Sequence, residues 1–254
     1  MSDDAKEAER FYSQVYKEQK LLNKFKPSDE FALGVFNNSK NPIKIIDIGC
    51  GMGHFLTSLK NLRKNAQDEY HGTDVANEGL KIAKSKGIKT KKADLNNKLP
   101  YRDNYFDFVY CSETIEHIYD TDNLVLEIRR ILKPTGLVIF TTPNLASWYN
   151  RIFLLLGIHP FFSEISTKDK TFGKAIFKKI IPDKWAAGHI RNFTIPAFND
   201  LLRYHGYRVV KNKTFTLMEI PKTIRWFDRI MSRINLGSDI MVIARKKEDI
   251  KSNQ

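Results

Sequence analysis

Residues 43–56 read Ile43-Lys44-Ile45-Ile46-Asp47-Ile48-Gly49-Cys50-Gly51-Met52-Gly53-His54-Phe55-Leu56. An apolar, strand-like run contains an acid near its end and is followed by three alternating glycines. Glycine adopts positive φ and has no Cβ, so a ligand can lie against the backbone where the chain passes from a strand into a helix. The pattern therefore predicts a strand, a cofactor-binding loop and a helix.

The spacing of the glycines argues against two common cofactors. The dinucleotide fingerprint G-x-G-x-x-G, begun at Gly49, needs a glycine where His54 stands, and begun at Gly51 it needs one where Leu56 stands. The phosphate loop of nucleoside triphosphate enzymes needs Lys and then Ser or Thr after its last glycine, and neither follows Gly53 in the right place. The loop fits NAD and nucleoside triphosphates poorly.

The segment from Asp47 to Gly53 resembles motif I of the class I S-adenosylmethionine (SAM) dependent methyltransferases. SAM carries a cationic sulfonium and no pyrophosphate, so an acid beside the glycines suits it. The companions of that motif follow in order: a strand at 69–75 that carries Asp74, a short strand at 87–95 that carries Asp94, a strand and loop within 99–118, and a strand after a turn at 134–136. The Glu-His-Ile ending of the 99–118 block is typical of the ubiquinone-biosynthesis-like branch.

The cofactor contacts are expected at the ends of these strands. An acid at the end of the second strand, Asp74, is placed to accept hydrogen bonds from both ribose hydroxyls. The resemblance implies that Asp94 receives the adenine amino group and that Leu95 lends a backbone amide. The cofactor-binding residues are predicted to be Asp47, Gly49, Cys50, Gly51, Gly53, Asp74, Val75, Asp94, Leu95 and Cys111. The cysteines are interpreted as packing residues, and each acid or glycine has the alternative of a helix cap or a turn.

The resemblance also implies the architecture: a Rossmann-like α/β fold with a seven-stranded mixed sheet in the order 3-2-1-4-5-7-6, the last strand antiparallel, and helices on both faces. A last core helix is predicted over 195–205, and final strands over 207–215 and 239–245. Residues 1–40 are predicted to form an N-terminal helical cap, with an amphipathic segment at 5–25. Residues 41–254 form the SAM-binding domain, with a helical lid insertion at about 145–190.

Composition predicts a soluble enzyme. The 254 residues are 42% hydrophobic, which is enough for a large core, and two cysteines make no disulfide framework. The N-terminal residues are polar, unlike a secretory signal, and no apolar run approaches the ~20 residues of a bilayer-spanning helix. We therefore expect a cytoplasmic protein, with peripheral contact to a membrane as an open alternative, and we predict no metal ligand.

Positive charge is concentrated in the second part of the chain, where residues 151–254 contain 20 Lys and Arg against 9 Asp and Glu. Such a surface suits anionic lipid, a phosphate-bearing substrate or nucleic acid, although lysines on solvated faces explain it equally well. Two amphipathic segments, 145–162 and 222–234, carry aromatic and basic residues. They suit either an interfacial membrane contact or a lid in which both helices bury their apolar faces over the substrate, and we favour the lid.

Methyl transfer from a sulfonium is an in-line displacement, so the protein mainly positions the acceptor. A hydroxyl acceptor also needs a base, for which the candidates are His117, after the fourth strand, and His189, in the Gly-His-x-Arg segment; the alternative for each is a structural role. Glu113 and Glu116 are interpreted as helix-start acids rather than acceptor contacts.

The hypothesis from the sequence is a SAM-dependent methyltransferase that O-methylates a small, glycan-like or lipid-linked acceptor. The alternatives are an RNA methyltransferase that uses the basic C-terminal surface and a non-catalytic SAM-binding scaffold. The chain has no Asn/Asp-Pro-Pro-Tyr/Phe motif and no aromatic-interleaved basic platform, so nucleic acid is the less favoured substrate. The oligomeric state is left open.

Overall fold

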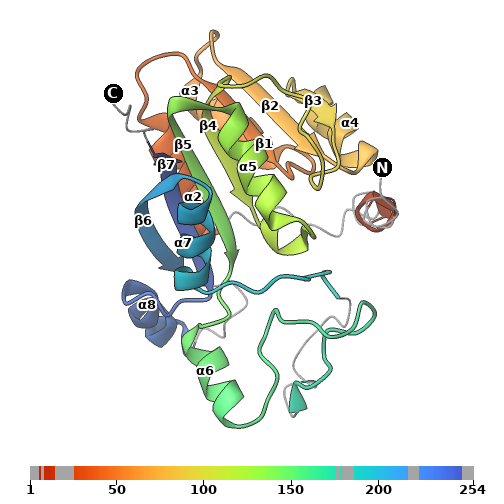
Figure 1. Ribbon diagram of the computed structural model, residues 1–254, viewed down its shortest axis with the longest axis vertical. Coiled ribbons are helices and arrows are strands. Elements are labelled where there is room, and N and C mark those ends of the chain that lie inside the picture. Colours follow the sequence, from red (N-terminus) through yellow and green to blue (C-terminus); the bar gives the residue numbers. More distant parts are fainter. Residues whose placement is uncertain are drawn as a thin grey trace, which may run out of the picture.

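The computed structural model describes residues 6, 9–14, 26–175, 178, 186–216 and 223–247. In this part of the chain seven strands form one sheet: β1 (Lys44–Ile48), β2 (Glu69–Asp74), β3 (Lys89–Lys92), β4 (Phe106–Ser112), β5 (Leu132–Pro143), β6 (Tyr207–Phe215) and β7 (Asp239–Lys246). Their order is β3-β2-β1-β4-β5-β7-β6 (Figure 1). The first five strands are parallel, and β7 runs antiparallel to both β5 and β6. The predicted order and the antiparallel last strand are confirmed.

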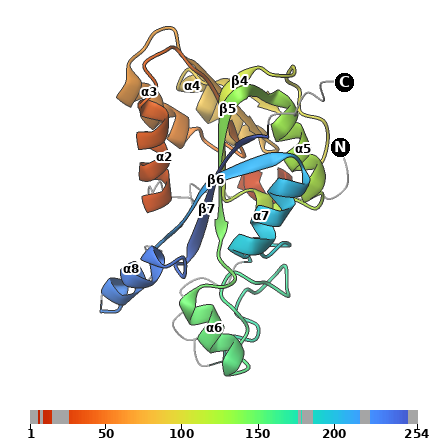
Figure 2. The same ribbon diagram turned by 60° about the vertical axis from the view of Figure 1, so that its left-hand side comes forward.

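Helices cover both faces of this sheet. Figure 2 shows α2 (Pro27–Asn37), α3 (His54–Arg63) and α4 (Asn77–Ser85) on one side, and α5 (Thr121–Ile131) and α7 (Ile195–Tyr204) on the other. A short 3-10 helix, η1 (Ile115–His117), follows β4. Helices α6 (Trp148–Leu155) and α8 (Arg225–Arg233) lie beyond the sheet at one end of the molecule.

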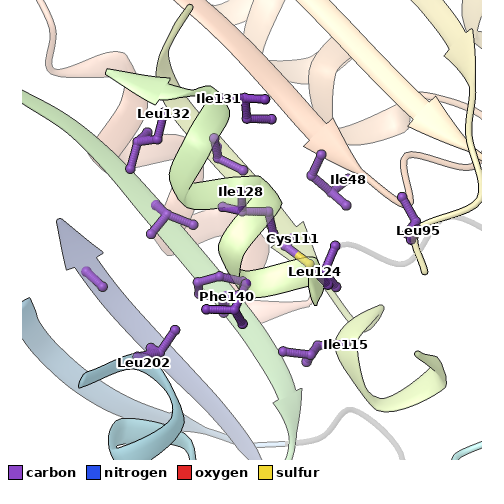
Figure 3. Packing of buried hydrophobic residues seen from close by; sticks show 14 of the residues in the cluster. Ile48, Leu95, Cys111, Ile115, Leu124, Ile128, Ile131, Leu132, Phe140 and Leu202 are labelled. Atoms are coloured by element: carbon purple, nitrogen blue, oxygen red, sulfur yellow. The ribbon is translucent and has the colours of Figure 1, made fainter. Parts of the chain in front are cut away.

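The sheet separates two apolar cores because successive side chains of a strand point to opposite faces. In β1, Ile45 packs with α2 and α3, whereas Ile46 packs on the α5 side. Helix α5 presents Leu124, Ile128 and Ile131 to the sheet at helical spacing, and Figure 3 shows them against residues of β4 and β5. Burial on both faces explains why the central strands are continuous apolar runs in the sequence.

The predicted bounds of β2, α7, β6 and β7 agree with the structure within one residue. The third strand, predicted over 87–95, is shorter in the structure, and the start of β5 also differs. The predicted turn at 134–136 lies inside β5, which already begins at Leu132. The pairing with β4 is irregular there: Leu132 pairs with Phe106, and Leu137 pairs with Phe108. The three residues of the expected turn thus form a bulge-like irregularity within the strand. The space there is tight, because the Cβ of any larger residue at Gly136 would lie 2.6 Å from Leu132 Cδ1.

The N-terminal region is helical where the structure describes it. Residues 9–14 are helical, and α2 packs Phe36 into the core beneath the sheet. Residues 15–25 of the predicted amphipathic segment and much of the lid between 176 and 185 lie outside the described residues. The boundary between a cap and a cofactor domain at residue 40, and the lid limits, therefore stay predictions. None of the helices in the described ranges has the length and apolarity needed to cross a bilayer.

Candidate active site

The glycine loop joins β1 to α3 at the carboxyl edge of the sheet. Gly49, Gly51 and Gly53 have φ values of +77°, +49° and +69°, which other residues rarely adopt. A Cβ on Gly49 would lie 2.3 Å from Thr114 Oγ1, so this position also lacks room for a side chain. The amides of Gly49 and Cys50 both donate to the Thr73 carbonyl, at 2.8 and 3.0 Å. The loop is thereby fixed to β2 with its backbone bare, as the predicted cofactor loop requires.

Asp74 ends β2 and connects two loops of the site. Its carboxylate accepts hydrogen bonds from the amides of Gly51 and Ala76, each at 2.9 Å. The side chain is 5% exposed at this edge. Each carboxylate oxygen has two lone-pair sites, so these bonds leave capacity for further donors. The ribose contact stays a prediction, and the structure adds a second role: Asp74 holds the glycine loop in place.

Asp47 is a buried acid on β1 directly before the loop. Its carboxylate accepts no hydrogen bond from any residue in the described part of the chain, and burial together with the negative charges of Asp29 and Asp74 raises its pKa well above the usual value. A cationic ligand beside it would favour the ionised form. A buried acid beside a bare glycine loop is therefore a fit for the sulfonium-bearing cofactor predicted from the sequence.

The remaining predicted cofactor residues lie along the same edge. Asp94 accepts hydrogen bonds from the side-chain amides of Asn96 and Asn97, while the Leu95 amide donates to no acceptor in the described ranges. Val75 is half-buried after β2. An open amide next to an anchored acid is suited to the paired donor and acceptor of an adenine edge. These contacts stay predictions.

Both cysteines are packing residues in the structure. Cys111 is fully buried, and Cys50 is 7% exposed. Cys50 fills the space over Gly72, where a Cβ would lie 2.6 Å from its sulfur. Burial raises the pKa of both thiols, so neither is a ready thiolate.

Residues 9–14, part of the predicted amphipathic segment, lie across this edge, and their Tyr12 was not singled out from the sequence. Ser13 donates to Glu78, Glu9 pairs with Lys92, and the Tyr12 ring lies 6.0 Å from that of His117. Burial, and then the negative charges of Glu116 and Asp74, raise the pKa of the Tyr12 hydroxyl. These contacts connect the α4 and β3 side of the edge to η1. The amphipathic pattern indicated a covering helix, but only the long-range contacts identify Tyr12 as its inward residue.

The two predicted histidines meet in space although they are far apart in the sequence. The ring centroids of His117 and His189 are 4.8 Å apart. His117 Nδ1 lies 3.0 Å from the Gly188 carbonyl, and His189 Nδ1 lies 2.8 Å from the Phe162 carbonyl. A carbonyl only accepts, so in the neutral rings Nδ1 carries the proton and Nε2 carries the lone pair. Burial, and then the neighbouring His189, lower the pKa of His117 to about 4. His117 Nε2 is therefore a proton-accepting nitrogen at neutral pH.

The acids of the 113–116 segment were interpreted from the sequence as helix-start residues. Glu116 does lie in the first turn of η1, whereas Glu113 precedes it, and both side chains have further partners. Glu113 pairs with Lys26 at 2.6 Å and accepts from Thr141, while Glu116, 1% exposed, accepts from Thr142 at 3.1 Å. Glu113 has φ +48°, a strained value of the kind found at functional sites.

Their charges differ as well. Burial and then Glu113 raise the pKa of Glu116 well above its usual range, whereas the Lys26 ammonium outweighs burial and lowers that of Glu113. The site thus contains one stable carboxylate and one carboxyl group that favours its proton.

Backbone contacts hold the later insertion against η1. Glu164 accepts from the amides of residues 187–189, and the amides of Ile190 and Arg191 donate to the Glu116 carbonyl, at 2.9 and 3.0 Å. Residues 187–191 therefore form a strap that is fixed against η1, and His189 reaches the site as part of it. Neither Glu164 nor Lys26 was predicted, because nothing local in the sequence links Glu164 to residues 187–189 or Lys26 to Glu113.

The same cluster offers ligand atoms to an ion. Within the described ranges, Glu116, His117 and His189 each present one such atom, and the three atoms lie within 4.8 Å of one another. Nitrogen and carboxylate donors of this kind suit several divalent metals. The sequence indicated no metal ligand because only the fold brings His189 to η1.

Comparisons with known proteins agree with this geometry. Residues 46–140 match the family model described as a methyltransferase domain. The ubiquinone biosynthesis O-methyltransferase of Colwellia psychrerythraea is 33% identical over 116 residues, which are 42% of this chain and 46% of that protein. The norajmaline N-methyltransferase of Rauvolfia serpentina is 32% identical over 108 residues, which are 40% of this chain and 36% of that protein. The match thus spans less than half the length of these curated relatives.

A solved structure extends the likeness in fold over most of the chain. The SAM-dependent methyltransferase from Mesorhizobium loti superposes with a TM-score of 0.58 at 17% identity and covers 86% of this chain and 98% of that one. The fold, the glycine loop and the matched family together indicate SAM as the cofactor.

Proposed function

We propose that this chain uses its class I SAM-dependent methyltransferase domain to transfer a methyl group from SAM to an oxygen of a small, glycan-like or lipid-linked acceptor. The observation that carries the proposal is the histidine pair. Two imidazoles present Nε2 lone pairs at the carboxyl edge where β1, β2 and β4 end, beside the predicted cofactor loop.

The residues divide the work between holding the cofactor and preparing the acceptor. When bound, SAM supplies an electrophilic methyl carbon. Gly49, Gly51, Gly53 and Asp47 would line its amino acid and sulfonium part, and Asp74 its ribose. Nε2 of His117 or His189 would accept the proton of the acceptor hydroxyl as its oxygen attacks, and the strap at 187–191 would hold that ring in place.

Glu116 supports an acceptor that brings hydrogen-bonding hydroxyl groups. Its Oε1 is buried without a partner in the described part of the chain and lies 3.9 Å from His117 Nε2. A buried polar atom without a partner costs free energy, which a bound hydroxyl would recover. The similarity to ubiquinone biosynthesis O-methyltransferases is consistent with oxygen as the methylated atom, whereas the similarity to an N-methyltransferase leaves nitrogen as the alternative.

The test compares histidine variants in a transfer assay. His117→Gln/His189→Gln should lower transfer of labelled methyl groups by about 10²–10⁴-fold while SAM affinity stays the same, because base catalysis contributes about that factor. His205→Gln, directly after α7 and outside this cluster, is the matched control and should keep the full rate. A double variant with the wild-type rate would exclude both rings as bases.

The acceptor class is tested in the same assay. Lipid, saccharide and RNA fractions of a cell extract serve as acceptors. Label in a lipid or saccharide fraction supports the proposal, and label confined to RNA would replace it with the nucleic-acid alternative. Binding of SAM without transfer to any fraction would favour a scaffold.

A further inference from the structure

Helix α8 buries its acid and exposes large apolar residues, which is the reverse of the usual arrangement in a surface helix. Asp228 is 0% exposed and accepts a hydrogen bond from Trp148 Nε1 at 2.7 Å. Trp226 is 63% exposed, and Ile230, one turn later, is 45% exposed. A helix of a water-soluble protein normally buries such residues and exposes its acid. The outer face of α8 therefore presents Trp226 and Ile230 to solvent.

Helix α6 shows the same feature beside it. Phe153 is buried, whereas Leu154, Leu155 and Leu156 at its C-terminal end are 57%, 87% and 67% exposed. Scattered exposed leucines are ordinary, but three in succession at one helix end are not. The lid interpretation expected the two helices to bury their apolar faces on each other. Helices α6 and α8 do meet at Trp148, but these three leucines stay exposed.

Trp148 joins the two helices into one unit. Its ring lies 5.1 Å from that of Phe227 in an edge-to-face contact, and its amide donates to the Leu236 carbonyl at 3.0 Å. Figures 1 and 2 both show α6 and α8 at the same end of the molecule, beyond the carboxyl end of β5. We call residues 148–156 and 224–234 the two-helix end.

The charge around these apolar residues is positive. Arg229 and Arg233 are exposed one turn apart, adjacent to the row of Trp226 and Ile230, and neither makes an ion pair within the described ranges. Arg151 is exposed on α6.

The nearby acids are occupied within the protein. Glu164 binds backbone amides, Asp169 accepts from Thr171, and Asp228 is buried. The two-helix end thus presents apolar and basic groups. None of these three acids places an exposed carboxylate opposite its arginines.

We propose that the two-helix end docks on the surface of an anionic lipid bilayer. Tryptophan, leucine and arginine on one face are the composition of interfacial helices, in which the apolar groups enter the headgroup region and the arginines bind lipid phosphates. A second copy of the chain fits less well, because a two-fold contact through this face would bring the same arginines together. The inference goes beyond methyl transfer, and its test needs no turnover.

Vesicle flotation tests it, with full-length protein and vesicles of phosphatidylcholine alone or mixed with phosphatidylglycerol. The wild type should float with the mixed vesicles at low salt and stay in solution with phosphatidylcholine alone. Arg229→Gln/Arg233→Gln should bind roughly 30-fold more weakly, since each basic residue near an anionic surface contributes about 1 kcal/mol, or fivefold. Leu155→Ser/Trp226→Ser should lose binding as well.

The matched control is Leu62→Ser, a leucine on α3 that is 51% exposed and outside the two-helix end. It should bind like the wild type, and circular dichroism confirms that each variant is folded. Absence of flotation by the wild type, or equal flotation of all variants, would overturn the proposal. A dimer by sedimentation that Leu155→Ser/Trp226→Ser abolishes, without vesicle binding, would assign the face to a second copy instead.

Discussion

Replacement of Asp74 separates its two roles. In Asp74→Ala the amides of Gly51 and Ala76 lose their acceptor at 2.9 Å, and each buried amide left unpaired costs about 1–3 kcal/mol. We therefore expect the free energy of unfolding to fall by roughly 2–6 kcal/mol, measured by urea denaturation without cofactor. The loss of these two loop hydrogen bonds is the reason for the lower stability.

The same variant should bind SAM weakly. Two hydrogen bonds from ribose hydroxyls to a carboxylate contribute about 1.5–3 kcal/mol each, so the Kd should rise by roughly 100-fold or more in titration calorimetry. Loosening of the glycine loop would also weaken binding, so the affinity alone does not identify the ribose contact.

Titration with a ribose-modified ligand separates the loss of the ribose contact from the loosening of the glycine loop. S-adenosylhomocysteine and its 2′,3′-dideoxy analogue are titrated into the wild type and into Asp74→Asn, which keeps the side chain's size and one acceptor oxygen. The wild type should discriminate strongly against the dideoxy analogue, and Asp74→Asn should discriminate much less. Equal discrimination by both proteins would remove Asp74 from the ribose site and leave it only the loop contacts.

Other perturbations have defined outcomes. Gly49→Ala should lower the free energy of unfolding by roughly 2–4 kcal/mol in urea, because its Cβ would lie 2.3 Å from Thr114 Oγ1 at φ +77°. The control, Gly157→Ala, has φ +68° but no atom within 4 Å of the added Cβ, and it should cost about 1 kcal/mol. Equal losses in the two variants would contradict the steric argument. Because the pKa of His117 is about 4 when folded and 6.5 when unfolded, the unfolded chain binds more protons between these values, and stability should fall by up to roughly 3 kcal/mol as the pH drops from 6.5 to 4. His117→Gln should remove this part of the pH dependence, and parallel stability curves for the two proteins would refute it. If the histidine pair acts as bases without an ion, EDTA should leave methyl transfer unchanged, whereas a loss restored by a divalent cation would make Glu116, His117 and His189 a metal site.

The strand order could be predicted because the chain carries ordered local signals. The glycines at 49, 51 and 53 and the acid at the end of β2 depend on backbone conformation and hydrogen bonding within a short stretch, so the sequence displays them directly. The start of β5 was misjudged because Pro and Gly are usual turn residues, and only its pairing with β4 shows the irregularity within the strand.

The acceptor side was predicted less completely because its partners are distant along the chain. Lys26 reaches Glu113, Glu164 holds the strap, and Tyr12 lies beside His117 through contacts that no periodicity displays. The exposure of apolar residues on α6 and α8 could not be predicted either, because an amphipathic pattern predicts that one face is covered but does not tell whether protein or lipid covers it.

The central claim is that this chain transfers a methyl group from SAM to an acceptor oxygen. The most direct measurement incubates the protein and SAM labelled in its methyl group with fractionated cell extract, and titrates SAM into the same preparation. We predict that SAM binds and that an ether-linked or ester-linked methyl group appears in a lipid or saccharide fraction. A preparation that is folded but does not bind SAM would contradict the account at its first step, and label found only on nitrogen or in RNA would contradict the proposed acceptor.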